Sequence, residues 1–272
     1  MCAGAFDDQS YDAIYQDFES PLMQKVRQEA YGRDIGQHSW VTAEELEVDI
    51  PRLRLMGASR FLDLGCGPCG PLLFTVGQVR CRASGVDVSP SAIAVGRRRA
   101  SKLGLERFVT LTEADLNGPL PFESGIFEAV VSFDVVLHLL DRAVFFREVA
   151  RVLRPGGRFL FTDAGVVTGL ITDEETRLRT FHGYTQFVQP GFNEKMLEVG
   201  GLRLVDCVDR TANLVKNATG RVRARFNHQR ELEQQEGAGY FYRQQRYLET
   251  VVCLAQRRAM LRMMYLAEPR AA

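Results

Sequence analysis

The sequence predicts an α/β fold built on a mostly parallel sheet. Between about residues 59 and 164, short apolar runs alternate with stretches of helical character. The runs are rich in Val, Ile, Leu and Phe, which is typical of strands buried on both faces of a parallel sheet. A glycine-rich turn follows the first run, as expected where a strand passes into a helix beside a ligand. Five strands are predicted here, at residues 60–65, 83–88, 108–113, 127–133 and 158–162.

Two of the connecting helices have clear boundaries. Residues 91–103 begin after Ser89 and Pro90, which are typical of a helix start. Asp141 is the predicted N-cap of a helix over residues 141–153, which ends before Pro155. Because strands and helices alternate, the strands should be parallel, with helices on both faces of the sheet.

The remaining chain adds to this core. Residues 202–208 are a predicted sixth strand, and residues 260–267 a seventh, which would close an edge of the sheet. Residues 193–199 are predicted to form a packing helix before the sixth strand. Three segments outside the alternation have helical character and are expected to cover the site as lids: residues 1–45, 166–195 and 213–258.

Composition restricts the class of partner. The chain has 272 residues, and its 34 Lys and Arg residues balance 34 Asp and Glu residues. Binding to nucleic acid or to an anionic membrane depends on excess positive charge, so neither is expected as the main partner. No stretch approaches about 18 consecutive apolar residues, so no transmembrane helix is expected. Residues 1–20 contain acidic residues and no Lys or Arg, unlike a signal peptide.

These features favour a cytoplasmic protein that acts on a small molecule. The six cysteines are scattered along a chain too large to need disulfides, so we expect reduced thiols. We expect a monomer or a homodimer, and no metal site.

The turn after the first predicted strand contains two motifs. Gly65, Gly67 and Gly70 form a G-x-G-x-x-G pattern between a strand and a helix, the fingerprint of dinucleotide binding. Cys66 and Cys69 have the C-x-x-C spacing of a thioredoxin-like redox site, which requires a thiol of low pKa at a helix N-terminus. The simpler interpretation is that both cysteines are small residues accommodated in a tight turn.

Asp63, two residues before Gly65, bears on which ligand this turn can hold. A nicotinamide dinucleotide would place its pyrophosphate at the helix N-terminus, where a carboxylate would repel it. A cationic ligand would be attracted instead, and S-adenosylmethionine carries a sulfonium and an ammonium group but no phosphate. An NAD(P)-dependent oxidoreductase remains the alternative.

Acidic residues lie near the carboxyl ends of five predicted strands, at Asp63, Asp87, Asp115, Asp134 and Asp163. Ligands of open α/β sheets bind at this end of the strands. Asp87 follows Gly65 by 22 residues, the position of an acid that binds ribose hydroxyls. Asp115 is placed to accept a hydrogen bond from the amino group of adenine. A rim of carboxylates suits a cationic cofactor.

Residues 59–164 resemble the class I S-adenosylmethionine-dependent methyltransferases. The resemblance implies a Rossmann-like sheet of seven strands whose last strand is antiparallel, within a methyltransferase domain at residues 46–272. The matching segments are LDLGCG at 62–67, GVDVS at 85–89, EADL at 113–116, VSFDVVLHL at 131–139 and VLRPGG at 152–157.

The resemblance also implies roles around the cofactor. Asp87 would hold the ribose, and Asp115 with Leu116 would hold the adenine. The turn is one residue longer than the commonest form in the family, so the resemblance assigns roles to Gly65 and Gly67 more firmly than to Gly70. Further cofactor-binding residues are expected on the strands and in the stretch before the first strand, namely Asp63, Gly65, Cys66, Gly67, Val88, Phe133, Gln37 and Trp40.

Within that superfamily, the segments resemble enzymes that methylate phosphoethanolamine, sarcosine, quinone precursors and natural-product hydroxyls. In phosphobase N-methyltransferases, a histidine shortly after the fourth strand takes part in catalysis together with an N-terminal tyrosine. His138 matches that histidine, and Tyr11 or Tyr15 would supply the tyrosine.

Methyl transfer from a sulfonium is an in-line displacement, so the protein aligns the acceptor and, where required, removes a proton. His138 is the first candidate base because histidine titrates near neutrality, with Asp163 second and His182 third. Asp134, His182 and Tyr15 are expected to contact the acceptor. Oxygen or nitrogen is favoured over carbon as the methylated atom, and a non-catalytic binding module is a further alternative.

Residues 216–230 contain one lysine and four arginines. A solvated helix face is the simpler interpretation of this segment. The alternative is an anionic acceptor, such as a carboxylate or a phosphate, guided by arginine.

Overall fold

The computed structural model describes residues 14–270 and contains one sheet of seven strands. Its strands are β1 (Arg60–Leu64), β2 (Arg82–Asp87), β3 (Val109–Glu113), β4 (Phe127–Phe133), β5 (Leu153–Val167), β6 (Leu202–Asp209) and β7 (Met260–Pro269). They are arranged in the order β3-β2-β1-β4-β5-β7-β6. Strand β7 runs antiparallel to both neighbours, and the pairs among β1 to β5 are parallel. The predicted Rossmann-like sheet with an antiparallel last strand is confirmed.

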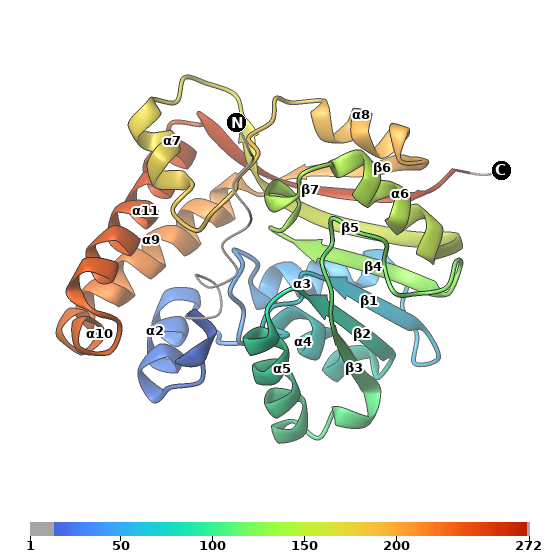
Figure 1. Cartoon of the computed structure of the whole chain (residues 1–272), viewed down its shortest axis with the longest axis horizontal. Helices are drawn as coiled ribbons and strands as arrows, with labels where there is room; N and C mark the ends of the chain where they lie inside the picture. The colour runs from blue at the N-terminus through green and yellow to red at the C-terminus, as the bar shows by residue number, and fades with distance from the viewer. Residues whose placement is uncertain (1–13, 271–272) are drawn as a thin grey trace.

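Helices cover both faces of this sheet, as Figure 1 shows. Apolar side chains alternate along each strand, so neighbouring residues enter different cores. Phe61 packs in the core under three helices, α3 (Ala43–Asp49), α4 (Gly70–Val79) and α5 (Pro90–Lys102). Leu62 packs in the core under α6 (Arg142–Val152) and α8 (Phe192–Val199).

The predicted helix starts are confirmed at α5 and α6. The Ser89 side chain accepts a hydrogen bond from the Ala92 N–H, and the Asp141 carboxylate accepts from the N–H groups of Ala143 and Val144. Helix α6 passes directly into β5, which begins at Leu153 and is longer than the predicted strand.

A second group of helices lies beside the sheet rather than on it (Figure 1). Helix α9 contacts both α2 and α11, so the three form a cover over one end of the sheet. The cover helices are α2 (Pro21–Tyr31), α7 (Asp173–Arg179), α9 (Thr211–Asn227), α10 (Gln229–Glu236) and α11 (Ala238–Gln256). Short 3-10 turns are η1 (Ile50–Leu53), η2 (Glu106–Phe108) and η3 (Val136–His138).

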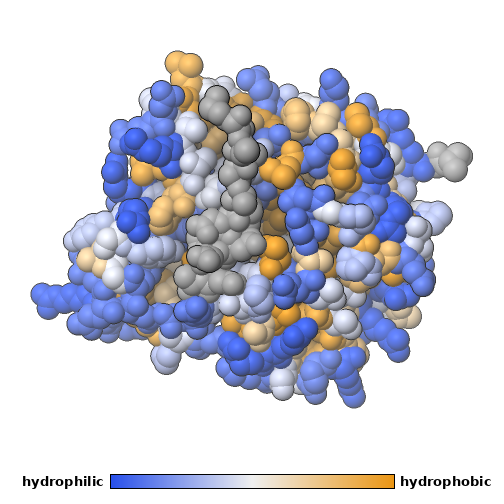
Figure 2. Space-filling model, viewed as in Figure 1, coloured by the Kyte–Doolittle hydropathy of each residue, from blue (hydrophilic) through white to orange (hydrophobic). Residues whose placement is uncertain are grey.

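Figure 2 shows apolar residues in small groups among hydrophilic ones on the viewed face. Within residues 14–270, no helix combines the length and apolar character needed to cross a membrane.

Two sequence expectations are corrected. Strand β7 does not close an edge of the sheet; it lies between β5 and β6, with Tyr265 opposite both Phe161 and Cys207. Residues 166–195 are helical only in α7 and at the start of α8. Strand β5 extends to Val167 and a bridge joins Val166 to Val188, so backbone pairing replaces the expected helix there.

Candidate active site

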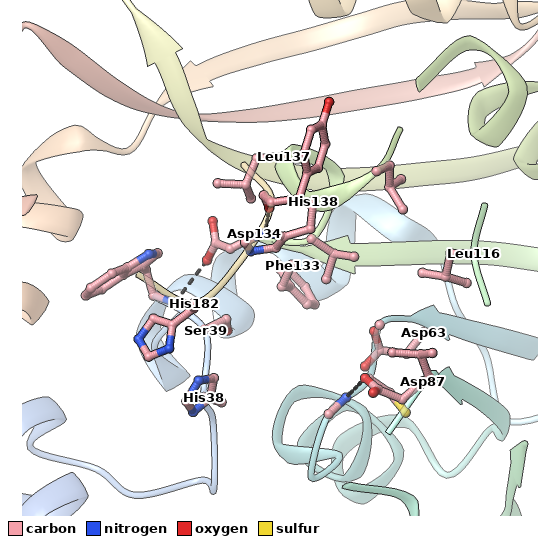
Figure 3. Close-up of a pocket in the computed structure, with 18 of the residues that line it drawn as sticks. His38, Ser39, Asp63, Asp87, Leu116, Phe133, Asp134, Leu137, His138 and His182 are labelled. Atoms are coloured by element: carbon pink, nitrogen blue, oxygen red, sulfur yellow. Dashed lines mark hydrogen bonds between the residues drawn. The ribbon is translucent and has the colours of Figure 1, made fainter. Parts of the chain in front are cut away.

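A cavity of about 460 Å³ lies at the carboxyl ends of β1, β2 and β4, where the sheet meets the cover helices. Its walls combine turns that follow these strands with residues from the segment before β1, from the loop after α7 and from α9 and α11. Figure 3 shows Asp63 and Asp87 at one end of the cavity and His38 and His182 at the other. Sixteen site residues were predicted from sequence, and fourteen of them line the cavity: Tyr15, Trp40, Asp63, Gly65, Cys66, Gly67, Asp87, Val88, Asp115, Leu116, Phe133, Asp134, His138 and His182.

The glycine turn after β1 approaches β2 closely. The N–H groups of Gly65 and Cys66 both donate to the Val86 carbonyl oxygen, at 2.8 and 3.0 Å. Gly65 has a φ of +75°, and a Cβ there would lie 2.5 Å from the Val135 side chain. Glycine is therefore required at this turn, because any side chain would collide with Val135, two residues after β4.

Asp87 is oriented by the backbone around it. Its Oδ2 accepts from the Gly67 N–H at 2.8 Å, and its Oδ1 accepts from the Ser89 N–H at 3.0 Å. These two bonds join the glycine turn to the start of α5 and hold the carboxylate at the cavity wall.

Asp63 is 1% exposed and lines the same end of the cavity. Its Oδ2 has no hydrogen-bond partner within residues 14–270. Burial, with the neighbouring Asp87 carboxylate, raises the pKa of Asp63 to about 8. A buried carboxyl group with an unsatisfied oxygen favours a cationic ligand, because the positive charge would stabilise its ionised form.

The loop after β3 forms the third side of this end. The Asp115 Oδ1 accepts from the backbone and side-chain nitrogens of Asn117, at 2.9 Å each, so the carboxylate is exposed but fixed in direction. Leu116 is buried and lines the cavity.

Asp134 lies between the two ends and belongs to a buried charge network. It has a φ of +59° and accepts from the Trp40 N–H at 2.9 Å, so it fixes the segment before β1. Its Oδ1 accepts from Arg262 Nε and Thr162 Oγ1, each at 2.9 Å. Arg262 also donates to both oxygens of Glu45. The single guanidinium of Arg262 is therefore shared between the carboxylates of Asp134 and Glu45.

His138 lies on η3, directly after β4, and lines the cavity. Its Nδ1 is 2.8 Å from the Tyr184 carbonyl oxygen. Since a carbonyl oxygen only accepts, Nδ1 carries the hydrogen, and Nε2 holds the lone pair of the neutral ring. Burial lowers the pKa of His138, and this outweighs the hydrogen bond to Tyr184.

Two further histidines line the opposite end. Burial and the Arg221 charge lower the pKa of His38 to about 3. Burial also lowers the pKa of His182, with the His38 and Arg221 charges acting in the same direction. Tyr15 packs edge-on against His38, with ring centroids 5.5 Å apart. Tyr11, the other tyrosine considered, lies outside the described residues.

Asp163, the second candidate base, does not line the cavity. Its side chain is fully buried and accepts from Arg142 of α6 and from Asn193 of α8. Successive side chains of a strand point to opposite faces, and Asp163 points toward α6 and α8. The prediction that it acts at the cavity is therefore wrong.

Gln37 is also outside this cavity. It is buried in its own loop, where its Oε1 accepts from the Ile35 N–H at 3.0 Å. Gly70 contacts this same segment, because a Cβ there would lie 2.4 Å from the Gly36 carbonyl oxygen. The third glycine of the motif thus permits close packing between α4 and the segment before β1.

Cys66 and Cys69 are both buried thiols, with sulfur atoms 3.7 Å apart. The neighbouring Cys69 thiol and burial raise the pKa of Cys66 well above its usual range. A redox cysteine requires a lowered pKa, so the simpler interpretation of two small residues in a tight turn is favoured.

Several lining residues were not predicted from sequence. Arg221 was considered only as part of a basic segment. The others come from loops and cover helices, whose position depends on tertiary packing, and they carry no local motif; they include His38, Ser39, Arg179, Tyr184 and Tyr247.

Comparison with known proteins agrees with this geometry. A family model described as a methyltransferase domain matches residues 62–161. Methyltransferase GfsG of Streptomyces halstedii is 34% identical over 46% of this chain and 44% of its own length, so the chain spans less than half of that relative. Sarcosine/dimethylglycine N-methyltransferase of Halorhodospira halochloris is 26% identical over 82% of this chain and 72% of its own length.

The fold is also found in solved structures. The Haemonchus contortus phosphoethanolamine N-methyltransferase 2, in complex with phosphomonomethylethanolamine and S-adenosylhomocysteine, superposes with a TM-score of 0.80 at 18% identity. The match covers 96% of this chain and 60% of that chain. With the glycine turn and the acid-lined strand ends, these matches show that residues 62–161 match a methyltransferase domain and that the chain is similar to S-adenosylmethionine-dependent methyltransferases.

Proposed function

We propose that the protein transfers the methyl group of S-adenosylmethionine to an oxygen or nitrogen atom of a small-molecule acceptor. The observation that carries this proposal is a single cavity with carboxylates at one end and a histidine of fixed tautomer further along it. The first feature suits a cationic methyl donor, and the second suits removal of a proton from an acceptor.

The residues at the acidic end fit the cofactor. The unsatisfied Asp63 oxygen would face its positively charged methionine portion. Asp87 would accept from the ribose hydroxyls, and the loop at Asp115 and Leu116 would contact the adenine. Val88 and Phe133, which also line the cavity, would complete the apolar walls. The bound cofactor supplies a methyl group already activated by a sulfonium.

His138 is the proposed general base. Because Tyr184 accepts the Nδ1 hydrogen, the neutral ring would take a proton at Nε2. A lowered pKa keeps the ring neutral at physiological pH. A positioned base of this kind contributes roughly 10²–10⁴-fold to a rate when the acceptor must lose a proton.

The cover would align the acceptor and exclude water. We propose that residues 46–272 act as one methyltransferase domain, with residues 1–45, 166–195 and 213–258 as its cover. Trp40, Tyr184 and Tyr247 come from these segments and line the cavity. Holding the acceptor in line with the donor supplies about 7–11 kcal/mol of barrier reduction in favourable cases.

A thermal-shift comparison tests the cofactor assignment. We expect S-adenosylhomocysteine to raise the melting temperature and NADH and NADPH to leave it unchanged, because a pyrophosphate would lie beside Asp63 and Asp87. Stabilisation by a nicotinamide cofactor alone would support the oxidoreductase alternative and reject the proposal. Asp87→Ala should weaken S-adenosylhomocysteine binding by tenfold or more, and an unchanged affinity would remove Asp87 from the site.

A further inference from the structure

Among residues 14–270, the buried arginines are paired with acids, with one exception. Six arginines within residues 14–270 are buried, and five of them form an ion pair: Arg27 with Asp34, Arg142 with Asp163, Arg158 with Glu268, Arg225 with Glu236, and Arg262 with Asp134 and Glu45. Arg179, at the end of α7, is 3% exposed and forms no ion pair in that part of the chain.

Arg179 lines the cavity and is only partly satisfied by the protein. Its Nη2 donates to the Ala164 carbonyl oxygen at a long 3.3 Å, and its buried Nε has no hydrogen-bond partner among the described residues. The guanidinium lies 5.3 Å from the ring centroid of Tyr247. Burying a charge without an opposite charge is unfavourable, so the site favours a ligand that brings a negative charge.

A second arginine lies against the same wall. Arg221 of α9 lines the cavity and lies 4.8 Å above the ring centroid of Trp40. Trp40 and Tyr247 are stacked, with ring centroids 6.4 Å apart. Arg221 therefore lies against one ring of this pair and Arg179 against the other. Like Arg179, Arg221 forms no ion pair with a carboxylate in the described chain. Glu236 of α10, which lines a second cavity together with Arg221, is paired with Arg225.

The charges of the cavity are therefore divided between its ends. Asp63, Asp87 and Asp115 line the cofactor end. Asp134, which lies between the two ends, pairs with Arg262, and Arg262 also pairs with Glu45. The lowered pKa values of His38 and His182 keep both rings neutral, so neither ring changes the charge at this end of the cavity.

The acceptor also has room to extend past Arg221. A second cavity of about 290 Å³ shares His38, His182 and Arg221 with the first. It is lined partly by apolar residues of α2, among them Met23 and Val26. Arg221 thus lies where an acceptor would pass from the reaction site into this second space.

We propose that the acceptor is an organic anion whose carboxylate or phosphate group is bound by Arg179 and Arg221. This inference rests on the proposed methyl transfer and adds the chemical class of its acceptor. Arginine is suited to both groups, because its planar fork donates two parallel hydrogen bonds to an oxyanion. Of the basic segment predicted at residues 216–230, Arg221 is the member that reaches the first cavity.

Two titrations test the proposal, in a buffer free of carboxylate and phosphate. The first measures S-adenosylhomocysteine affinity by calorimetry for the wild type, Arg179→Gln and Arg221→Gln. The second adds inorganic phosphate, and separately acetate, to each protein loaded with S-adenosylhomocysteine. Arg177→Gln on α7 and Arg223→Gln on α9 are matched controls, because both side chains are exposed.

We expect the loaded wild type to bind phosphate or acetate, and the anion that binds identifies which oxyanion the site prefers. Each cavity variant should weaken anion binding tenfold or more, while its S-adenosylhomocysteine affinity stays within about twofold. The two control variants should match the wild type in both titrations. Arg179→Lys retains the charge without the fork and should give an intermediate loss, which separates anion binding from a folding defect.

Three results would overturn the proposal. The loaded wild type binds neither anion; the cavity variants bind the anion as well as the controls do; or S-adenosylhomocysteine affinity falls together with anion binding, which would assign the arginines to the carboxylate of the cofactor itself. Failure of the wild type to bind S-adenosylhomocysteine would instead contradict the proposed function, so the two failures are distinguishable.

Discussion

His138 and Tyr184 are joined by a hydrogen bond between the imidazole Nδ1 and the Tyr184 carbonyl oxygen, at 2.8 Å. His138 follows β4 in the sheet, whereas Tyr184 lies in the loop after α7 of the cover. The bond therefore fixes the histidine tautomer and also ties a cover loop to the sheet. The proposed base is therefore oriented for catalysis only when this cover loop is in place.

The pH dependence of the rate should report His138. Its pKa is lowered from 6.5 by burial, and a general base is active when it is deprotonated. At saturating cofactor, kcat for any acceptor that the enzyme methylates should fall on the acid side, with a midpoint below pH 6.5, and stay level from pH 7 to 8. An NMR titration of the His138 ring should give the same midpoint.

His138→Gln should lower kcat by roughly 10²–10⁴-fold while S-adenosylhomocysteine affinity holds. His228→Gln is the control, because His228 lies outside the cavity and pairs with Glu29 and Glu231. The base would be another residue if His138→Gln kept its turnover. The same would follow if His228→Gln also lost the fall of kcat at acid pH.

Asp63→Asn should raise the stability of the fold and lower its affinity for the cofactor. The folded protein raises the pKa of Asp63 from 3.8 to about 8. Between these values the unfolded chain releases the proton that the native state keeps, so this group makes the wild type less stable as pH rises from about 4 to about 8. Asparagine cannot ionise, so the gain in melting temperature from Asp63→Asn should grow between pH 5 and pH 8.

The same substitution should weaken S-adenosylhomocysteine binding tenfold or more at pH 8, because it removes the negative charge facing a cationic group. Wild-type affinity should rise from pH 6 to pH 8 as the bound ligand promotes ionisation of Asp63, and the variant should lose that slope. A variant with unaltered affinity and the wild-type slope would mean that Asp63 is not a cofactor contact.

Arg142→Met should destabilise the fold without affecting cofactor binding. Arg142 and Asp163 form a buried ion pair between α6 and β5, and Asn193 bonds to both. Removing one partner of a buried pair costs about 3–5 kcal/mol, because the other charge stays buried. Chemical denaturation measures this loss, and Arg147→Met, an exposed residue on the same helix, should change stability little.

The same pair tests the corrected role of Asp163. Asp163→Asn should lower stability and leave kcat per folded molecule near the wild-type value. A folded Asp163→Asn variant that binds S-adenosylhomocysteine normally but has lost turnover would return Asp163 to the catalytic machinery.

The strands could be predicted because each contains a short apolar run, and β4 was predicted with the bounds that it has, whereas β5 is longer than its run. The partners of a strand could not be predicted in the same way. The apolar run of β7 reveals that it is buried, but its position between β5 and β6 depends on long-range pairing that no local pattern encodes.

The cofactor end of the site was predicted largely because its residues follow strands in order. Asp163 obeyed the same pattern and yet points to the opposite face, since one step along a strand reverses the side chain. Arg179 and His38 could not be found from sequence, because they reach the cavity from irregular segments and cover helices. Their placement depends on tertiary contacts and not on the spacing of residues in the sequence.

Gly70→Ala should move the segment before β1 and so lower the affinity for S-adenosylhomocysteine, although residue 70 does not line the cavity. A Cβ at residue 70 would lie 2.4 Å from the Gly36 carbonyl oxygen and 2.7 Å from the Gln37 nitrogen. Both are backbone atoms, so the segment that carries Trp40 must shift; overpacking of this kind costs about 1–3 kcal/mol. Gly77→Ala on the same helix meets nothing within 4 Å and should stabilise the protein by about 0.5–1 kcal/mol, as expected for alanine in a helix. S-adenosylhomocysteine affinity should fall in the first variant only; equal affinities in both would mean that this contact does not position the cavity wall.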